Sequence, residues 1–167
     1  MWDKIERVVA GHPERSKVVR VLLEHGLAVR GSRVYLNQIE VPTVKVARVA
    51  GVDRRTVSET IKAIEANSEL RSLFSKFQSA GLSLKGVANT LGLGVVEIVA
   101  DDPHKPGIIA GASQLMKEAG ISIRQALVDD PELVPEPKLI LIVERSIPGE
   151  LIDRIRRISG VAKVSLY

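Results

Sequence analysis

The run Val95-Val96-Glu97-Ile98-Val99-Ala100 decides the fold of the C-terminal half, because the spacing of apolar residues changes there. Its β-branched residues favour an extended strand, whereas the preceding segments space their apolar residues for helices. The expected elements after this run are a helix opening at Pro106-Gly107 and ending at Gly120, strands over residues 121–128 and 139–143, a helix opening at Pro148, and a strand over residues 161–166.

This order, β-α-β-β-α-β, predicts an antiparallel sheet with both helices on one face, a ferredoxin-like domain over residues 93–167. Other modules share the order but need residues that are missing here. RNA-recognition modules need aromatic residues on the central strands, and Val95–Ala100 and Leu139–Val143 contain none. Copper-carrying modules need a cysteine pair, and the chain has no cysteine. Acylphosphatase-like enzymes need an arginine after the first strand, where Asp101-Asp102 stands.

The turn before the first helix of this domain has the chemistry of a ligand seat. Pro106 suits a helix start because its missing N–H would be unpaired there. Gly107 has no side chain, so a ligand can approach the backbone. The N–H groups near Gly107 and Ile108, with the helix dipole, can receive a carboxylate. An α-amino group needs an acceptor, which Asp101 or Asp102 could supply.

The domain resembles the ACT domain, an amino-acid-sensing module of metabolic enzymes and regulators. The resemblance rests on His104-Lys105-Pro106-Gly107-Ile108-Ile109, on Ala119-Gly120-Ile121-Ser122-Ile123, and on the stretches from Arg145 to Pro148 and from Gly160 to Val164. It implies side-by-side dimers with amino acids bound in the seam. The ligand contacts it implies, together with those expected from the turn, are Asp102, His104, Lys105, Gly107, Ile108 and Ser122. His104 departs from the family pattern, which has Asp or Asn there.

The N-terminal half carries a helix-turn-helix pattern between Val44 and Ser58. Ala47 is small where two helices would cross, and Gly51 can adopt the left-handed conformation of the turn. Asp53 can cap the second helix, which is expected over residues 54–66. This stretch resembles the helix-turn-helix of lac-repressor-type regulators, and the chain as a whole resembles archaeal-type predicted regulators of amino-acid metabolism with an ACT domain.

The same stretch supplies candidate DNA contacts. Arg54 and Arg55 would reach base edges or phosphates, with Ser58 on the same open side. The phosphate contacts expected from the preceding segment are Thr43, Lys45 and Arg48, and a wing would add Arg30 and Arg33. The acidic residues Asp53 and Glu59 oppose DNA binding. The alternative is a helix-turn-helix that only packs or dimerises.

Charge is distributed unevenly along the chain. Residues 1–90 hold 15 Lys/Arg and 9 Asp/Glu, a net charge of +6, whereas residues 91–167 hold 9 and 11, a net charge of −2. A basic N-terminal half is typical of a nucleic-acid partner, although an imbalance of this size also occurs for solubility alone.

The fold class predicted from these patterns is α+β. An all-α helix-turn-helix domain over residues 1–92 is followed by the ferredoxin-like ACT domain over residues 93–167. The N-terminal helices are expected over residues 2–9, 13–25 and 83–91 in addition to those above. Residues 29–34, Val-Arg-Gly-Ser-Arg-Val, predict either a small wing of two strands or an irregular loop.

The sequence indicates a regulator and not an enzyme. His12, His25 and His104 lack metal-ligand spacing, and the chain has neither a glycine-rich phosphate loop nor a nucleophile elbow. No cofactor, metal or membrane partner is expected, and the start of the chain lacks the pattern of a signal peptide, so a cytoplasmic location is expected. We expect a homodimer that binds an amino acid and DNA. The alternatives are an amino-acid-sensing subunit that docks on an enzyme and a dimeric scaffold with an empty seam.

Overall fold

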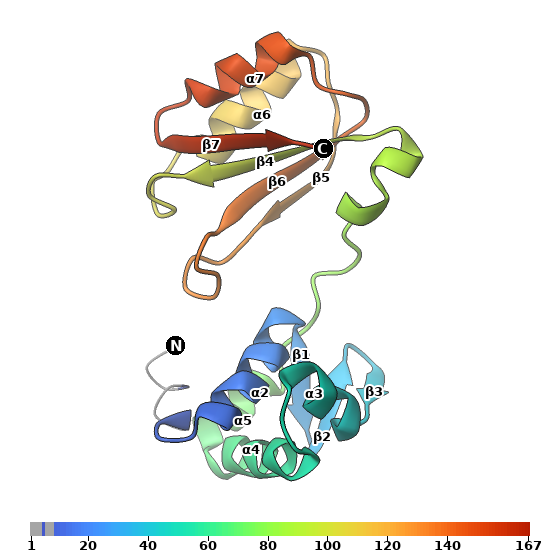
Figure 1. Cartoon of the computed structure of the whole chain (residues 1–167), viewed down its shortest axis with the longest axis vertical. Coiled ribbons are helices and arrows are strands. Elements are labelled where there is room, and N and C mark those ends of the chain that lie inside the picture. Colours follow the sequence, from blue (N-terminus) through green and yellow to red (C-terminus); the bar gives the residue numbers. More distant parts are fainter. Residues whose placement is uncertain (1–4, 6–8) are drawn as a thin grey trace. The chain divides into compact units, whose positions relative to one another are not determined.

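The structure, a computed structural model, describes residue 5 and residues 9–167 (Figure 1). The helix expected over residues 2–9 falls largely outside the described residues. The chain forms two compact units that divide between Gly81 and Leu82. Residues 82–92, which were expected in the first domain, therefore lie in the second unit.

The N-terminal unit combines helices with a small sheet. Its elements are α2 (Pro13–Glu24), β1 (Leu27–Arg30), β2 (Arg33–Leu36), β3 (Ile39–Val41), α3 (Thr43–Ala50), α4 (Arg54–Ala66) and α5 (Ser68–Phe74). The three strands pair antiparallel in the order β1-β2-β3. Helices α2, α3 and α4 pack on one another. Their shared core contains the buried residues Val18, Leu22, Val46, Val57 and Ile61.

The predicted fold class, an all-α N-terminal domain followed by a ferredoxin-like ACT domain, is wrong, because a three-stranded sheet separates α2 from α3. Two-residue turns make this sheet. Gly31 and Ser32 both have positive φ, at 55° and 61°, and Asn37 has a φ of 55° in the second turn. The strands are three or four residues long, too short for an alternating pattern to stand out from helical spacing. We name the β1–β2 hairpin, residues 27–36, the wing.

Gly26 joins α2 to the wing at a point where no side chain fits. Its φ is +60°, and a Cβ there would lie 2.7 Å from the backbone oxygen of Gln78. We expect Gly26→Ala to lower the free energy of unfolding by about 2 kcal/mol or more, since left-handed strain adds to a backbone clash. Gly51→Ala is the control, because Gly51 has a φ of +65° and open space around it. Equal losses in a denaturant titration would mean that the clash contributes nothing.

The C-terminal unit begins with a segment of irregular backbone and continues into a four-stranded sheet. Its elements are the 3₁₀ turns η1 (Lys85–Val87) and η2 (Asn89–Leu91), then β4 (Gly94–Ala100), α6 (Ile108–Glu118), β5 (Ile123–Val128), β6 (Lys138–Val143), α7 (Gly149–Arg156) and β7 (Val161–Leu166). The strands pair antiparallel in the order β5-β6-β4-β7. Helices α6 and α7 lie side by side on one face of this sheet (Figure 1).

Each face of the sheet has its own apolar cluster, because successive residues of a strand point to opposite sides. The helix-side cluster includes Val96 and Ile98 of β4, together with Met116 and Ile155 of the helices. The cluster on the other face contains Ala88, Leu93, Val95 and Ile142. Residues 84–93 therefore cover the second face. They do so as two 3₁₀ turns and not as the helix expected over residues 83–91.

Glu97 is a buried acid at the centre of this covered face, with 3% of its surface exposed. Lys85 pairs with its Oε1, Lys138 Nζ lies 3.6 Å from its Oε2, and the Tyr167 hydroxyl lies 3.5 Å from Oε2. Burial raises the pKa of Glu97, but the hydrogen bond and charge of Lys85, aided by Lys138, outweigh it and hold the pKa below its ordinary value. Glu97 thus ties residues 84–93 to the sheet as an ion.

Candidate functional site

The connection between α3 and α4 has the local geometry expected from the sequence. Gly51 is left-handed with a φ of 65°, and Val52 N donates to Ala47 O at 3.0 Å. The Asp53 side chain caps α4, since its Oδ1 accepts from Arg55 N at 2.7 Å. These expectations for Gly51 and Asp53 are confirmed. The turn fixes the start of α4 and presents Arg54 and Arg55 there.

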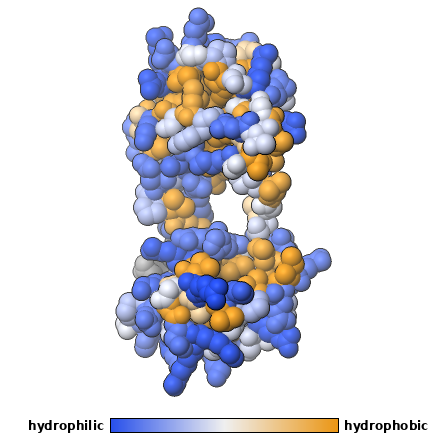
Figure 2. Space-filling view, turned by 45° about the vertical axis from the view of Figure 1, so that its right-hand side comes forward, coloured by the Kyte–Doolittle hydropathy of each residue, from blue (hydrophilic) through white to orange (hydrophobic). Residues whose placement is uncertain are grey.

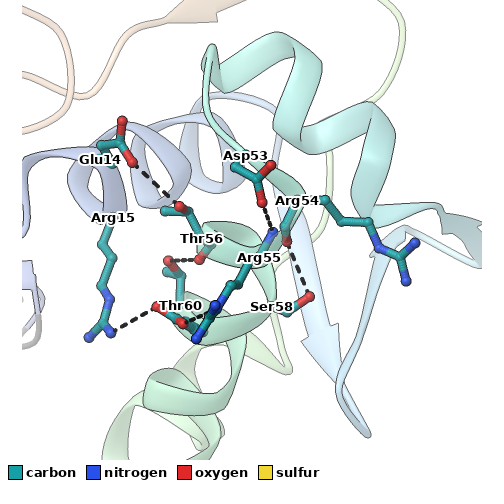
Figure 3. A network of polar contacts seen from close by, with 9 residues as sticks. Glu14, Arg15, Asp53, Arg54, Arg55, Thr56, Ser58 and Thr60 are labelled. Carbon is teal, nitrogen blue, oxygen red and sulfur yellow. Dashed lines mark hydrogen bonds and ion pairs between the residues drawn. The ribbon is translucent and has the colours of Figure 1, made fainter.

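The two arginines point in different directions (Figure 3). Arg55 Nε donates to Glu59 Oε1 at 3.0 Å, and the other oxygen of Glu59 lies 3.5 Å from Arg15 Nη2. The hydrogen bond from Arg55 lowers the pKa of Glu59, so this carboxylate is ionised at neutral pH. Thr56 on the same side donates to Glu14 Oε2 at 3.4 Å. The positive charge of Arg55 is therefore balanced by Glu59 of its own helix.

Arg54 extends to the other side, away from Arg55 and Glu14 (Figure 3). It lines a hollow of about 270 Å³. The hollow lies among the start of α4, the start of α3 and strands β2 and β3. Thr43 and Arg33 line it as well, and Arg33 Nη1 donates to Glu40 Oε2 at 2.9 Å. Two of the expected DNA contacts, Thr43 and Arg54, are thus brought together with one cation of the wing.

The remaining expected DNA contacts lie elsewhere. Lys45 lines a separate groove with Glu24 and His25. Arg48 is exposed on α3 and borders neither hollow. The Ser58 hydroxyl donates to Arg54 O at 3.2 Å within its own helix.

Arg30 of the wing makes its contacts within the small sheet and the turn that follows β2. Its Nη2 donates to Asn37 O, and its guanidinium lies 4.6 Å from the centroid of the Tyr35 ring. Of the two wing arginines, Arg33 lines the hollow and Arg30 does not.

A second candidate site is a pocket of about 160 Å³ in the C-terminal unit, at the end of β4 and the start of α6. Its floor is apolar and comes from Ile98, Ala100 and Leu139 of the sheet. Gly107 caps α6 with a φ of 107° and has no side chain, so it offers no side-chain acceptor to the first amides of this helix. A cavity of about 150 Å³ accommodates a molecule of benzene's size, so this pocket suits a small ligand.

Three of the expected ligand contacts, Lys105, Gly107 and Ile108, line this pocket, and three do not. Asp102 and His104 are exposed in the preceding loop, where Asp102 Oδ1 accepts from His104 N at 2.9 Å. Ser122 precedes β5, whose first residue is level with Gly94 through their common partner Val143. Ser122 therefore lies at the opposite end of the sheet from Ala100, about 20 Å along the strand direction.

Residues that were not expected from the sequence complete the pocket. They are Pro103, Pro106, Ile109, Val128, Asp129, Pro137 and Lys138. Asp129 is half-buried, and its Oδ2 accepts from Lys138 N at 3.2 Å. Lys138 of β6 lines the pocket, while its ammonium group pairs with Glu97 on the other face of the sheet. Asp129 could have been found from the sequence, because it directly follows the strand β5, which ends at the same edge of the sheet as β4.

Within the described residues, no group of three histidine, aspartate or glutamate side chains is placed to hold a metal ion. A membrane-spanning helix is likewise not found in that part of the chain.

No protein-family model matches the sequence, and no curated protein matches it significantly. The assignment of a function therefore depends on the two sites themselves.

Proposed function

We propose that this protein is an amino-acid-responsive regulator that binds DNA through the α3–α4 pair and a small ligand in the C-terminal pocket. The observation that carries the proposal is the open hollow where Arg54, Arg33 and Thr43 meet at the start of α4. The start of the second helix of such a pair is the end that enters a major groove in helix-turn-helix proteins. The resemblance to ACT-domain regulators implies the same function, and such a regulator would act in the cytoplasm.

The charge of the N-terminal unit supports a polyanionic partner. Residues 9–81 carry 12 Lys/Arg and 7 Asp/Glu, a net charge of +5. Cations that neutralise DNA phosphates release counterions, which makes the affinity depend on salt. Because Arg55 is balanced by Glu59 and Arg54 is free of that pair, the contribution of Arg54 is the larger of the two.

We expect Arg54→Ala to weaken duplex DNA binding about tenfold and to reduce the salt slope by about one phosphate. Arg55→Ala removes the same formal charge and is the matched control, with a smaller expected loss. Fluorescence anisotropy with a mixed-sequence duplex at two salt concentrations measures both. Wild-type binding that does not depend on salt would refute the DNA role, and equal losses would refute the special place of Arg54.

The C-terminal pocket supports an amino acid with an aliphatic side chain. The apolar floor suits such a side chain, and the uncapped amides at the start of α6 suit a carboxylate. Asp129, and not Asp101 or Asp102, is the acid beside the pocket that can accept from an α-amino group.

Ile109 and Val128 are exposed at the pocket rim, next to the outer edge of β5. That apolar surface supports a second copy of the chain as the partner there.

We expect at least one of the twenty amino acids to raise the melting temperature, and Asp129→Asn to weaken its binding about tenfold. Asp130→Asn is the control, because Asp130 is the exposed neighbour and does not line the pocket. Titration calorimetry compares the two variants. If no amino acid stabilises the protein, the sensing role is refuted and the scaffold with an empty seam remains.

A second candidate is an amino-acid-sensing subunit that contacts a protein without binding DNA. Val44 and Val49 favour it, because these apolar side chains of α3 are 48% and 63% exposed. Figure 2 shows hydrophobic groups at the surface of both units. The salt-dependence measurement above separates this candidate from the first.

A further inference from the structure

The tip of the wing is fastened to α4 by a single carboxylate. Ser32 N donates to Glu65 Oε1 and the Ser32 hydroxyl donates to Glu65 Oε2, both at 2.6 Å. These hydrogen bonds lower the pKa of Glu65, so the carboxylate is ionised at neutral pH. Both oxygens of Glu65 are thus used to hold one turn, across 33 positions of sequence.

The choice of serine at position 32 also matters for this attachment. Ser32 has a φ of 61°, a conformation in which glycine has no steric penalty and a residue with a Cβ does. Glycine would keep the N–H bond to Glu65 but would lose the hydroxyl bond. The strained serine therefore contributes the second half of the attachment.

The attachment sets the position of Arg33, the next residue along the chain. Arg33 begins β2 and lines the same hollow as Arg54. Glu40 of β3 holds its guanidinium through the hydrogen bond at 2.9 Å, which raises the pKa of Arg33. Glu65 and Glu40 consequently hold Arg33 in the same hollow that Arg54 lines.

We propose that Glu65 is a positioning residue for nucleic-acid binding, which fixes the wing on α4 so that Arg33 and Arg54 contact phosphates of the same duplex. This inference rests on the proposed DNA binding and names the residue that holds the wing in the interface. Because Glu65 is itself acidic, its two possible roles predict opposite effects on the affinity for DNA. If Glu65 acted only through its charge, removing it would strengthen binding to a polyanion. If Glu65 positions the wing, removing it weakens binding.

The experiment measures duplex affinity of the full chain for wild type, Glu65→Gln and Glu24→Gln at two salt concentrations. Glutamine keeps the size of Glu65 and loses the charged acceptor. Glu24→Gln removes an exposed acid at the end of α2, away from the hollow of Arg54. We expect Glu65→Gln to weaken binding about fivefold, within the range of couplings between contacting residues, and Glu24→Gln to leave it unchanged or slightly tighter.

A double-mutant cycle and amide exchange provide the readouts that a loss of folding would not mimic. Arg33→Ala is expected to weaken wild-type binding but to add little in the Glu65→Gln background. Amide exchange at residues 32–34 is expected to quicken in Glu65→Gln, with α4 still protected.

Three outcomes distinguish the proposals. Equal or tighter binding by Glu65→Gln overturns the positioning role and leaves DNA binding intact. Additive losses from Arg33→Ala and Glu65→Gln also overturn it. Salt-independent or absent binding by the wild type overturns both proposals, and that failure is already visible before any variant is made.

Discussion

Replacing Phe74 with alanine is expected to lower the free energy of unfolding of the N-terminal unit by about 3–5 kcal/mol. Phe74 ends α5 and is fully buried, and its ring meets that of Phe77 edge to face with centroids 5.1 Å apart. Helix α5 packs on β1, so the cavity would open beneath the wing. The loss combines the transfer of a large ring to water with the contacts that its neighbours forfeit.

The matched control for Phe74 is Leu73→Ala, one position earlier and only half-buried. Its expected loss is about 1–2 kcal/mol, because less apolar surface returns to water. Amide exchange followed through denaturant separates the two units, since the contacts of Phe74 lie within the first one. Similar losses for both variants, or a loss confined to the C-terminal unit, would contradict the role of Phe74.

Replacing Lys85 with methionine is expected to destabilise the C-terminal unit by about 2–4 kcal/mol at neutral pH. The change leaves the buried carboxylate of Glu97 without its nearest cation. This loss is smaller than is usual for a broken buried ion pair, because Lys85 is itself 41% exposed and Lys138 remains 3.6 Å from Glu97. The aliphatic part of methionine preserves most of the packing.

The pH dependence of this loss follows from the pKa of Glu97. In the wild type its pKa lies below the ordinary 4.5, so its ion pair contributes stability above that pH and loses it as pH falls further. In Lys85→Met, burial of Glu97 is opposed by Lys138 alone, so the pKa of Glu97 is higher than in the wild type and the folded variant takes up a proton first as pH falls. The stability difference between the two proteins therefore shrinks as pH falls through this range.

Two comparisons test this account of Glu97. The double variant Lys85→Met with Glu97→Gln is expected to be more stable at neutral pH than Lys85→Met alone, because no buried charge is left unpaired. Urea titrations between pH 7 and pH 3.5 provide the measurement. A stability loss that is the same at every pH would show that Lys85 acts by packing and not by its charge.

Much of the α3–α4 pair could be read from residues alone. The expected span of α4 over residues 54–66 is the observed one, because Asp53 caps it and Val57, Ile61 and Ile64 form one buried stripe. The left-handed Gly51 followed from glycine's freedom at positive φ. Local rules of this kind act over a few residues and do not depend on the rest of the chain.

Only some residues of the two candidate sites could be predicted from the sequence. Asp102 and His104 are close in sequence to Gly107, yet they bond to each other in the loop and leave the pocket to Asp129. Ser122 is displaced because the direction and register of β5 place its start at the other end of the sheet. Arg54 and Arg55 are neighbours in sequence, but successive residues of a helix point about 100° apart, so one meets acids and the other an open hollow.

By itself the sequence determined the helices and strands whose caps, turns and apolar spacing are local, and it determined which half of the chain is basic. Only the tertiary structure decided that a three-stranded sheet stands between α2 and α3, and that residues 84–93 cover a sheet as 3₁₀ turns. Strands of three residues and turns of 3₁₀ helix have little intrinsic preference, and gain their stability from partners far away in sequence. The pairing of Ser32 with Glu65 and of Lys85 with Glu97 is of that kind, and only the folded chain reveals it.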